Sequence, residues 1–252
     1  MSTPLPDRLI VSLHVPKTAG TAFADVLTQN YGSAVAFAYG PDHPKTHPLL
    51  RQLPASIPAE TIAKLEQEGV RVVHGHFSAH RYLEAVPDPA RYWMWLRDPV
   101  ERMISEYYFN RGRDDAENPQ VAQIREENLS LGDYAAKTRT RNLHKHLLGP
   151  LKIEELGFVG ISEFFDECLA LTGLAPLPKK TRLRNVTRNK EPVDIDTRRV
   201  IARNNIIDIA LYSAALQRVL ADRRAASDTP APAETSAGGL LGRLLDRGPR
   251  QS

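Results

Sequence analysis

The sequence predicts an α/β fold, in which helices cover both faces of a central, mostly parallel sheet to form a three-layer sandwich. Short apolar runs rich in β-branched and aromatic residues alternate along the chain with segments whose apolar residues recur at helical spacing. Parallel strands require crossover connections, which are usually helices, so this alternation is typical of βαβ units.

Length and composition exclude several classes of protein. The chain has 252 residues, of which 42% are hydrophobic and 25% charged, and these values exclude wholesale disorder. The formal net charge of +3 does not indicate nucleic-acid binding, and we expect no nucleic-acid partner. The single cysteine, Cys168, excludes an internal disulfide and a multi-thiolate metal site. No apolar run approaches the ~18 residues of a membrane span, so we expect a cytoplasmic protein without an integral membrane segment.

The first strand–loop–helix unit follows an N-terminal extension of residues 1–7. Residues 9–15 form an apolar run with β-branched side chains, which predicts a buried strand. Pro16 ends this strand, and a tight loop over residues 17–21 follows. The next apolar residues recur at helical spacing and predict a helix: Phe23, Val26 and Leu27.

Two more strands are predicted in the middle of the chain. A helix over 59–68 precedes a short strand over 70–73, and residues 92–96 form a further buried strand. Asp98 then provides an N-cap and Pro99 the first helical position, which is a favourable start for a helix. The apolar stripe of that helix consists of Val100, Met103, Ile104, Tyr107 and Tyr108.

The second half of the chain completes one domain over residues 8–224. Residues 110–150 are polar and predict a helical insertion, and a strand over 158–161 with a helix over 163–171 repeats the earlier pattern. One or two helices are expected over 197–223. Residues 225–252 are rich in Ala, Pro, Ser, Thr and Gly and are expected to form a disordered tail, because they cannot bury enough apolar surface to offset chain entropy.

The loop Lys17-Thr18-Ala19-Gly20-Thr21 is a candidate anion site. Backbone N–H groups at a strand-to-helix loop point toward the helix N-terminus, where the dipole favours a phosphate. Lys17 adds a charge and Gly20 permits close approach of the backbone. The sequence is not a Walker A loop, so it does not indicate a magnesium nucleotide. The alternative is a structural corner with a solvated lysine.

Arg97 and Ser105 form a second candidate anion site. Arg97 ends a predicted strand, at the crevice where open α/β sheets bind ligands, and Ser105 lies two turns into the following helix. A guanidinium and a hydroxyl can together bind a phosphate. The alternative is that Arg97 pairs with a surface carboxylate and Ser105 is an ordinary helix residue.

His74 and His76 follow the strand over 70–73 and are candidate proton acceptors, because an imidazole titrates near neutral pH. We expect the extended chain to direct the two side chains to opposite faces, so that at most one faces the reacting atoms. As zinc ligands they lack further ligands at a convincing spacing. A hydrogen-bonded structural role is the alternative for each.

These motifs occur in one order and together resemble the family of carbohydrate sulfotransferases that includes heparan sulfate 2-O-sulfotransferase. The resemblance extends over about residues 8–220. It rests on segments 14–21, 74–76, 97–105, 159–167 and 185–190, and on the later residues Asp208, Leu211 and Tyr212. It implies a P-loop-like α/β domain that binds 3′-phosphoadenosine 5′-phosphosulfate (PAPS) as cosubstrate and needs no metal. Ala22 departs from the family pattern, which often has a hydroxyl residue there, and residues 110–150 have no evident counterpart.

The resemblance assigns roles to particular residues. Residues 17–22 would hold the 5′-phosphosulfate, Arg97 and Ser105 the 3′-phosphate, and the basic loop around 184–188 would close over the nucleotide. The implied donor-binding residues are Lys17, Thr18, Ala19, Gly20, Thr21, Ala22, Arg97, Ser105, Arg184 and Thr187. His76 matches the catalytic base of the family, and His74 remains open as its alternative.

We therefore expect transfer of a sulfuryl group from PAPS to a hydroxyl of a carbohydrate or related acceptor, a glycan or a glycolipid. His76 would take the acceptor proton, and Lys17 would stabilise charge on the leaving oxygen. Residues 110–150 would face the acceptor. One alternative is a P-loop kinase or nucleotidase, with Asp98 as the candidate magnesium ligand. The other is a noncatalytic nucleotide-binding scaffold.

Overall fold

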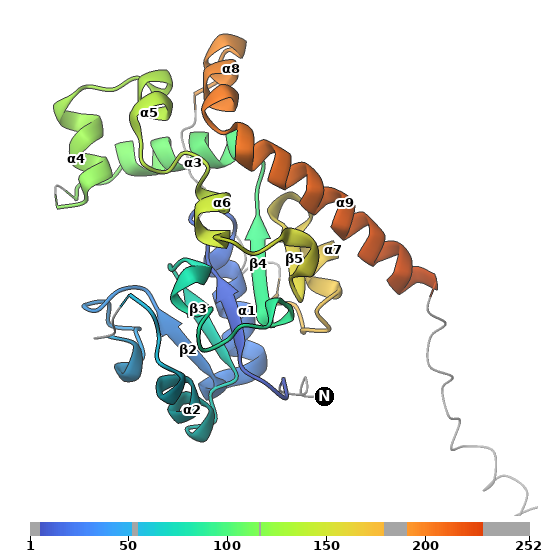
Figure 1. Ribbon diagram of the computed structural model, residues 1–252. Coiled ribbons are helices and arrows are strands. Elements are labelled where there is room, and N and C mark those ends of the chain that lie inside the picture. Colours follow the sequence, from blue (N-terminus) through green and yellow to red (C-terminus); the bar gives the residue numbers. More distant parts are fainter. Residues whose placement is uncertain (1–5, 52–54, 116, 179–190, 229–252) are drawn as a thin grey trace, which may run out of the picture.

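The computed structural model describes residues 6–51, 55–115, 117–178 and 191–228, and its centre is a five-stranded parallel sheet (Figure 1). The spatial order of the strands is β2-β3-β1-β4-β5, and every neighbouring pair is parallel. The strands are β1 (Ile10–Leu13), β2 (Val35–Ala38), β3 (Val72–Gly75), β4 (Tyr92–Leu96) and β5 (Phe158–Ile161). The predicted α/β sandwich is therefore confirmed, and β2 is a strand that the sequence analysis did not identify.

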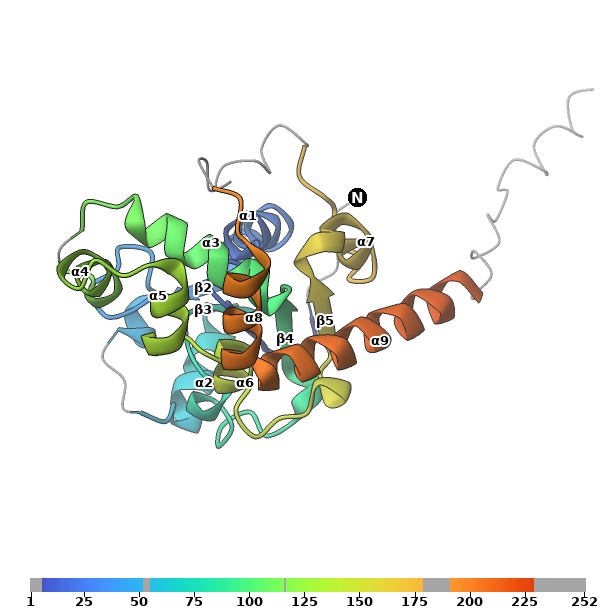
Figure 2. The same cartoon turned by 90° about the horizontal axis from the view of Figure 1, so that it is seen from above.

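Helices cover both faces of this sheet (Figure 2). Viewed from above, α1 and α7 lie on one face, whereas α2, α6 and α9 lie on the other. The helices are α1 (Gly20–Tyr31), α2 (Ala59–Gln67), α3 (Pro99–Arg111), α4 (Pro119–Glu126), α5 (Leu131–Lys137), α6 (Leu143–Leu148), α7 (Phe165–Ala170), α8 (Ile195–Asn204) and α9 (Ile206–Asp228). No helix in the described ranges is long and apolar enough to cross a membrane.

Helix α3 begins as the sequence predicts. Asp98 Oδ1 accepts hydrogen bonds from the backbone N–H groups of Val100 and Glu101, both at 2.9 Å, and Pro99 occupies the first turn. The cap satisfies two N–H groups that a helix N-terminus otherwise leaves without partners.

A second, smaller core lies outside the sheet, where α3 packs against α4, α5 and α8. Its apolar residues surround a buried ion pair, in which Arg102 Nη1 contacts Glu106 Oε2 at 2.8 Å. Arg102 Nη2 also donates to the carbonyl of Thr140, and the Thr140 hydroxyl donates to Glu106. This network joins α3 to the chain that leads into α6. Helices α4, α5 and α6 all fall within the predicted insertion of residues 110–150.

The C-terminal elements differ in detail from the prediction. The helix expected over 163–171 begins as a 3-10 turn, because Phe164 departs from helical geometry, and α7 follows it. The segment 197–223 contains parts of two helices, α8 and α9, which are separated at Asn205. Helix α9 continues to Asp228, so the predicted tail boundary at 225 is too early: Ala225 and Ala226 are strong helix formers that extend the helix. Residues 229–252 lie outside the described part of the chain.

Candidate active site

Three chain segments meet at one edge of the sheet because β1 lies between β3 and β4. The register pairs Leu13, the last residue of β1, with Gly75 of β3 and with Met94 of β4. Residues just beyond these strand ends are therefore neighbours although they lie some sixty to eighty positions apart. The guanidinium of Arg97 donates from Nη1 to the backbone carbonyl of Lys17 at 3.1 Å. The structure thus brings the two predicted anion-binding segments together.

The loop before α1 has an unusual backbone. Lys17 and Ala19 have φ values of 71° and 61°, in the left-handed region that non-glycine residues rarely occupy. Ala19 provides no side-chain cap, so no side chain at this position takes up the first-turn N–H groups of the twelve-residue helix α1. Thr21 is exposed and Ala22 is half-buried. Backbone N–H groups at the N-terminus of such a helix are the kind of donor that binds an anion.

Thr18 has a different role from the other loop residues. Its side chain is buried, and its hydroxyl donates to the carbonyl of Val15 at 2.8 Å. The Thr18 hydroxyl therefore stabilises the turn from within, whereas Lys17 and the exposed residues Ala19 and Thr21 form its outer surface.

Lys17 extends toward α3 and lies over an aromatic ring. Its Nζ is 3.7 Å from the ring centroid of Phe109, and the guanidinium carbon of Arg113 is 5.3 Å from the same ring. Such cation–π contacts contribute about 0.5–1 kcal/mol at exposed sites. Phe109 is 40% exposed, so the contact lies at the surface. Sequence reasoning missed Phe109 because it lies outside the apolar stripe of α3 and belongs to no motif.

Arg97 is half-buried and has a second partner in Glu163. Its Nε is 3.9 Å from Glu163 Oε1, and the same carboxylate oxygen accepts from the Asp98 N–H at 3.1 Å. A partly exposed ion pair of this kind contributes little to stability. Ser105 is 3% exposed within α3, and its contact with a phosphate remains a prediction. Arg184 and Thr187 lie outside the described residues.

His14, His74 and His76 stack at the ends of β1 and β3. The ring centroid of His14 is 4.9 Å from that of His74 and 4.2 Å from that of His76. The expectation that His74 and His76 point to opposite faces is wrong, because residues two apart in an extended strand share a face. They differ in exposure instead: His74 is buried, whereas His76 reaches the surface.

The hydrogen bond of His76 determines its tautomer. Its Nδ1 lies 2.9 Å from the backbone carbonyl of His14, and a carbonyl oxygen can only accept. Nδ1 therefore carries the proton, and Nε2 retains its lone pair. Desolvation by the surrounding protein lowers the pKa of His76, an effect that the bond to His14 partly opposes. A neutral imidazole with a free Nε2 is the state that a general base needs at pH 7.

The side chain of His74 is buried and does not reach the surface as His76 does. Its Nδ1 is 2.9 Å from the hydroxyl of Ser12 within the sheet, and burial together with the neighbouring His76 lowers its pKa to about 3. The structure therefore favours His76 over His74 as the proton acceptor.

His144 is also buried, and it joins two helices. Its Nδ1 is 3.0 Å from Asp208 Oδ2, and the Asp208 carboxylate accepts from the N–H groups of His144 and Lys145 at the start of α6. In return, Asn142 Oδ1 accepts from the N–H groups of Ile207 and Asp208 at the start of α9. The two helices cap each other, so His144 is a structural residue.

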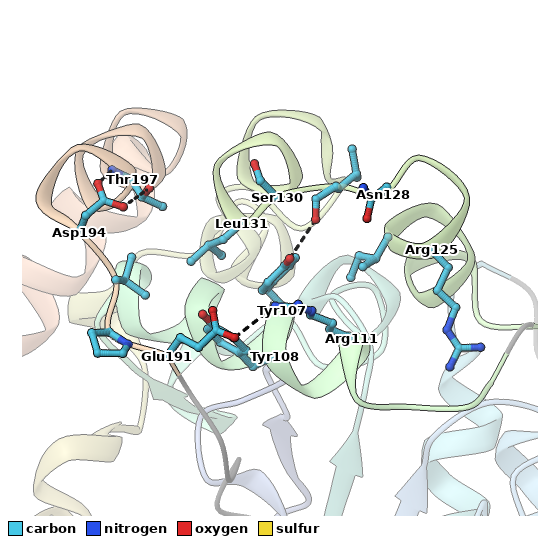
Figure 3. A pocket seen from close by; sticks show the side chains of 14 residues that line it. Tyr107, Tyr108, Arg111, Arg125, Asn128, Ser130, Leu131, Glu191, Asp194 and Thr197 are labelled. Carbon is cyan, nitrogen blue, oxygen red and sulfur yellow. Dashed lines mark hydrogen bonds and ion pairs between the residues drawn. The ribbon is translucent and has the colours of Figure 1, made fainter.

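A groove of about 610 Å³ lies on the outer side of α3 (Figure 3). Its lining includes Tyr107, Tyr108 and Arg111 of α3, and Glu191 before α8. Arg111 Nη1 and Glu191 Oε1 are 3.8 Å apart, so the groove contains a paired cation and anion beside two aromatic rings. Tyr107 and Tyr108 directly precede Phe109, over which Lys17 lies.

The buried histidines predict loss of stability in acid. His14, His74 and His144 have pKa values lowered below the ordinary 6.5, chiefly by burial, so the unfolded chain binds more protons than the folded one below that pH. The contribution of these three histidines to the free energy of unfolding is fully present above about pH 6.5 and is lost as the pH falls. For His74 the loss continues to about pH 3. Each such group contributes a slope of up to about 1.4 kcal/mol per pH unit.

Urea denaturation between pH 7.5 and 4 measures this slope. His74→Gln removes one titrating group and should reduce the slope by up to about 1.4 kcal/mol per pH unit. Equal slopes in wild type and His74→Gln would contradict the neutral, buried state assigned to His74.

Comparison with known proteins identifies the family. The model of the sulfotransferase family matches residues 5–147, which is more than half of the chain and includes the loop before α1, His74 within β3, His76 just after it, and Arg97 with Ser105. No curated protein matches the chain. Among solved structures, the mouse sulfotransferase SULT7A1 complexed with PAP is 12% identical, with a TM-score of 0.36 over 82% of this chain and 66% of that one. This chain thus spans just under two thirds of the length of that sulfotransferase. The match of the family model shows that the chain belongs to the sulfotransferase family.

Proposed function

We propose that the protein transfers a sulfuryl group from PAPS to a hydroxyl group of a carbohydrate acceptor. The observation that carries this proposal is the contact between Arg97 and the Lys17 carbonyl, which unites two cationic segments at one sheet edge. PAPS has anionic groups at both the 5′ and the 3′ positions, so it requires two such sites at a fixed separation. Membership of the sulfotransferase family supports the same chemistry.

The geometry supports a direct transfer. The open N–H groups at the start of α1 and the Lys17 ammonium would stabilise charge on the bridging oxygen as the sulfur–oxygen bond breaks. The acceptor oxygen forms the new bond to sulfur and releases its proton to Nε2 of His76. The products are a sulfate ester, adenosine 3′,5′-bisphosphate (PAP) and a protonated His76, which returns its proton to water. Every step uses a residue at the same edge of the sheet.

The kinase alternative loses its main candidate residue. It requires a carboxylate at a strand end for magnesium, and Asp98 was that candidate. Asp98 Oδ1 instead accepts from two backbone N–H groups as the cap of α3. The scaffold alternative gives no reason for a surface histidine that keeps Nε2 unprotonated.

The groove on α3 supports a carbohydrate as the acceptor. The partly exposed ring of Tyr108 presents an apolar face that a sugar ring can stack on. The paired charges of Arg111 and Glu191 offer both donors and acceptors to hydroxyl groups.

Titration with PAP in EDTA tests the donor site. Lys17→Ala and Arg97→Ala should each weaken binding about 10- to 100-fold, since a charge-assisted hydrogen bond contributes about 1.5–3 kcal/mol. Lys152→Ala is the matched control, because Lys152 is exposed and pairs with Glu155. Binding that requires magnesium, or that neither variant weakens, would contradict the proposal.

Labelled PAPS and a panel of acceptors test the substrate class. The panel contains neutral oligosaccharides, uronate-containing oligosaccharides, glycolipids and phenols. We expect sulfate ester on a saccharide, and Tyr108→Ala should raise the KM for that saccharide at least threefold with little change in PAP affinity. Product on phenols alone would contradict the carbohydrate assignment while leaving sulfuryl transfer intact.

His76→Ala tests the base. Loss of a general base lowers kcat by about 10²- to 10⁴-fold, and PAP affinity should stay within about threefold of wild type. Activity of the wild type should fall only below pH 6.5, because the pKa of His76 is lowered and the base is inactive once protonated. His80→Ala, which changes an exposed histidine four residues along the chain, is the control. Full activity of His76→Ala would remove His76 from this role.

A further inference from the structure

His14 is a buried titratable residue to which the proposed chemistry gives no role. It directly follows β1, is 8% exposed and lies at the centre of the histidine stack. Besides the rings of His74 and His76, it contacts the edge of Tyr39 at a centroid distance of 5.7 Å. Its ring thus separates the buried histidine from the exposed one.

The ring of His14 also packs against the loop before α1. A Cβ added to Gly20 would lie 1.8 Å from His14 Nε2 and 1.9 Å from its Cδ2, which no real contact allows. The residue at position 20 must therefore be glycine while this ring stays in place. The ring of His14 therefore contacts both the start of α1 and the ring of His76.

The ring of His14 packs against three neighbouring rings and against Gly20. Nδ1 of His14 is buried and has no hydrogen-bond partner among the residues that the structure describes. Burial, followed by the proximity of His74 and His76, lowers the pKa of His14 well below its ordinary value, so the ring is neutral. The neutral ring contacts the rings of His74, His76 and Tyr39 and the backbone at Gly20, so its shape restricts these neighbours.

We propose that His14 is a positioning residue, whose carbonyl and ring together hold His76 with its Nε2 free and directed away from the stack. The carbonyl of His14 fixes the proton on Nδ1 of His76 at 2.9 Å, and the ring, 4.2 Å away, restricts rotation of the imidazole. The role as a positioning residue for proton transfer rests on the proposed function. The effect on the state of His76 can be measured without any substrate.

Other groups near His76 also influence its pKa. The ring centroid of Tyr39 is 5.1 Å from that of His76, and His43 and His74 interact with His76 electrostatically. Asp25 of α1 acts on Tyr39. Tyr39 and His74 also contact the ring of His14, and His14→Phe keeps a ring beside them. A difference in His76 between His14→Ala and His14→Phe therefore reports the loss of the ring.

The test is ¹⁵N NMR of the imidazoles in the full-length protein, with His14→Ala and His14→Phe compared to wild type. In wild type we expect a single His76 tautomer protonated at Nδ1. The carbonyl remains in His14→Ala, but without the adjacent ring the His76 imidazole can rotate away from it, so we expect a mixture of tautomers. We also expect the pKa of His76 to rise toward 6.5, because water enters the vacated space. His14→Phe retains a ring and should keep the wild-type tautomer. His80→Ala is the control and should leave His76 unchanged.

A second variant reaches the same ring from the loop. In Gly20→Ala the new Cβ must displace His14, so the tautomer of His76 should become mixed as in His14→Ala. Gly132→Ala in α5 is the matched control, because its added Cβ would meet no atom closer than 3.9 Å. If His14→Ala does not fold, His14→Phe and Gly20→Ala still decide the question.

Turnover at pH 7 separates this inference from the proposed function. His14→Ala should lower kcat about 10- to 100-fold, the scale expected for a misplaced catalytic group, while His14→Phe stays within about threefold of wild type. A single, wild-type His76 tautomer in both His14→Ala and Gly20→Ala would overturn the positioning role even if the enzyme transfers sulfuryl groups. Conversely, the wild type could fail to bind PAP while His14→Ala and Gly20→Ala show mixed His76 tautomers. That result would uphold the positioning role of His14 and refute the donor assignment.

Discussion

The parallel pairing of β1 with β3 on one side and with β4 on the other is the constraint on which the site depends. Because parallel strands all end at one edge, the loop before α1, the histidine after β3 and the arginine after β4 become neighbours without any direct link in sequence. A shift of one residue in the register of β3 would turn His74 and His76 to the opposite face and separate them from His14. The chemistry of the site is thus a consequence of strand order and register.

Helix α3 connects the sheet with the helical layer beside it. It begins directly after β4 with the Asp98 cap, carries Phe109 under Lys17, and places its tyrosines in the groove. The buried Arg102–Glu106 pair fixes its orientation relative to the chain before α6. Removing one partner of such a pair leaves an uncompensated buried charge, which costs about 3–5 kcal/mol, so this layer is held in one arrangement. A rigid layer lets a surface groove keep a constant position relative to the loop before α1.

Local sequence signals predicted most of the elements that build the sheet. The apolar run at 92–96 and the Asp98–Pro99 start of α3 are determined by neighbouring residues, and the structure confirms them. The strand predicted over 70–73 is present, but it lies two residues later, at Val72–Gly75, and includes His74. β2 was missed because four residues, Val35–Ala38, flanked by a helix and a polar loop, are too short for periodicity to distinguish. The tail boundary was misplaced because composition changes at 225 while helix propensity does not.

Contacts between distant segments could not be predicted from the sequence. The stacking of His14 on His76 and the exchange of caps between Asn142 and Asp208 depend on how two elements meet, and no local pattern encodes them. The mistaken expectation about His74 and His76 came from the periodicity assumed for an extended strand. Exposure, which depends on the whole fold, distinguishes the two residues.

A crystal structure of the protein with PAP tests the central claim most directly, because it shows whether one nucleotide occupies both anion sites. The account predicts the 5′-phosphate at the N–H groups of the loop before α1 and near Lys17, and the 3′-phosphate on Arg97 in place of Glu163. PAP bound with only one phosphate at this edge, or at a different part of the surface, would contradict it.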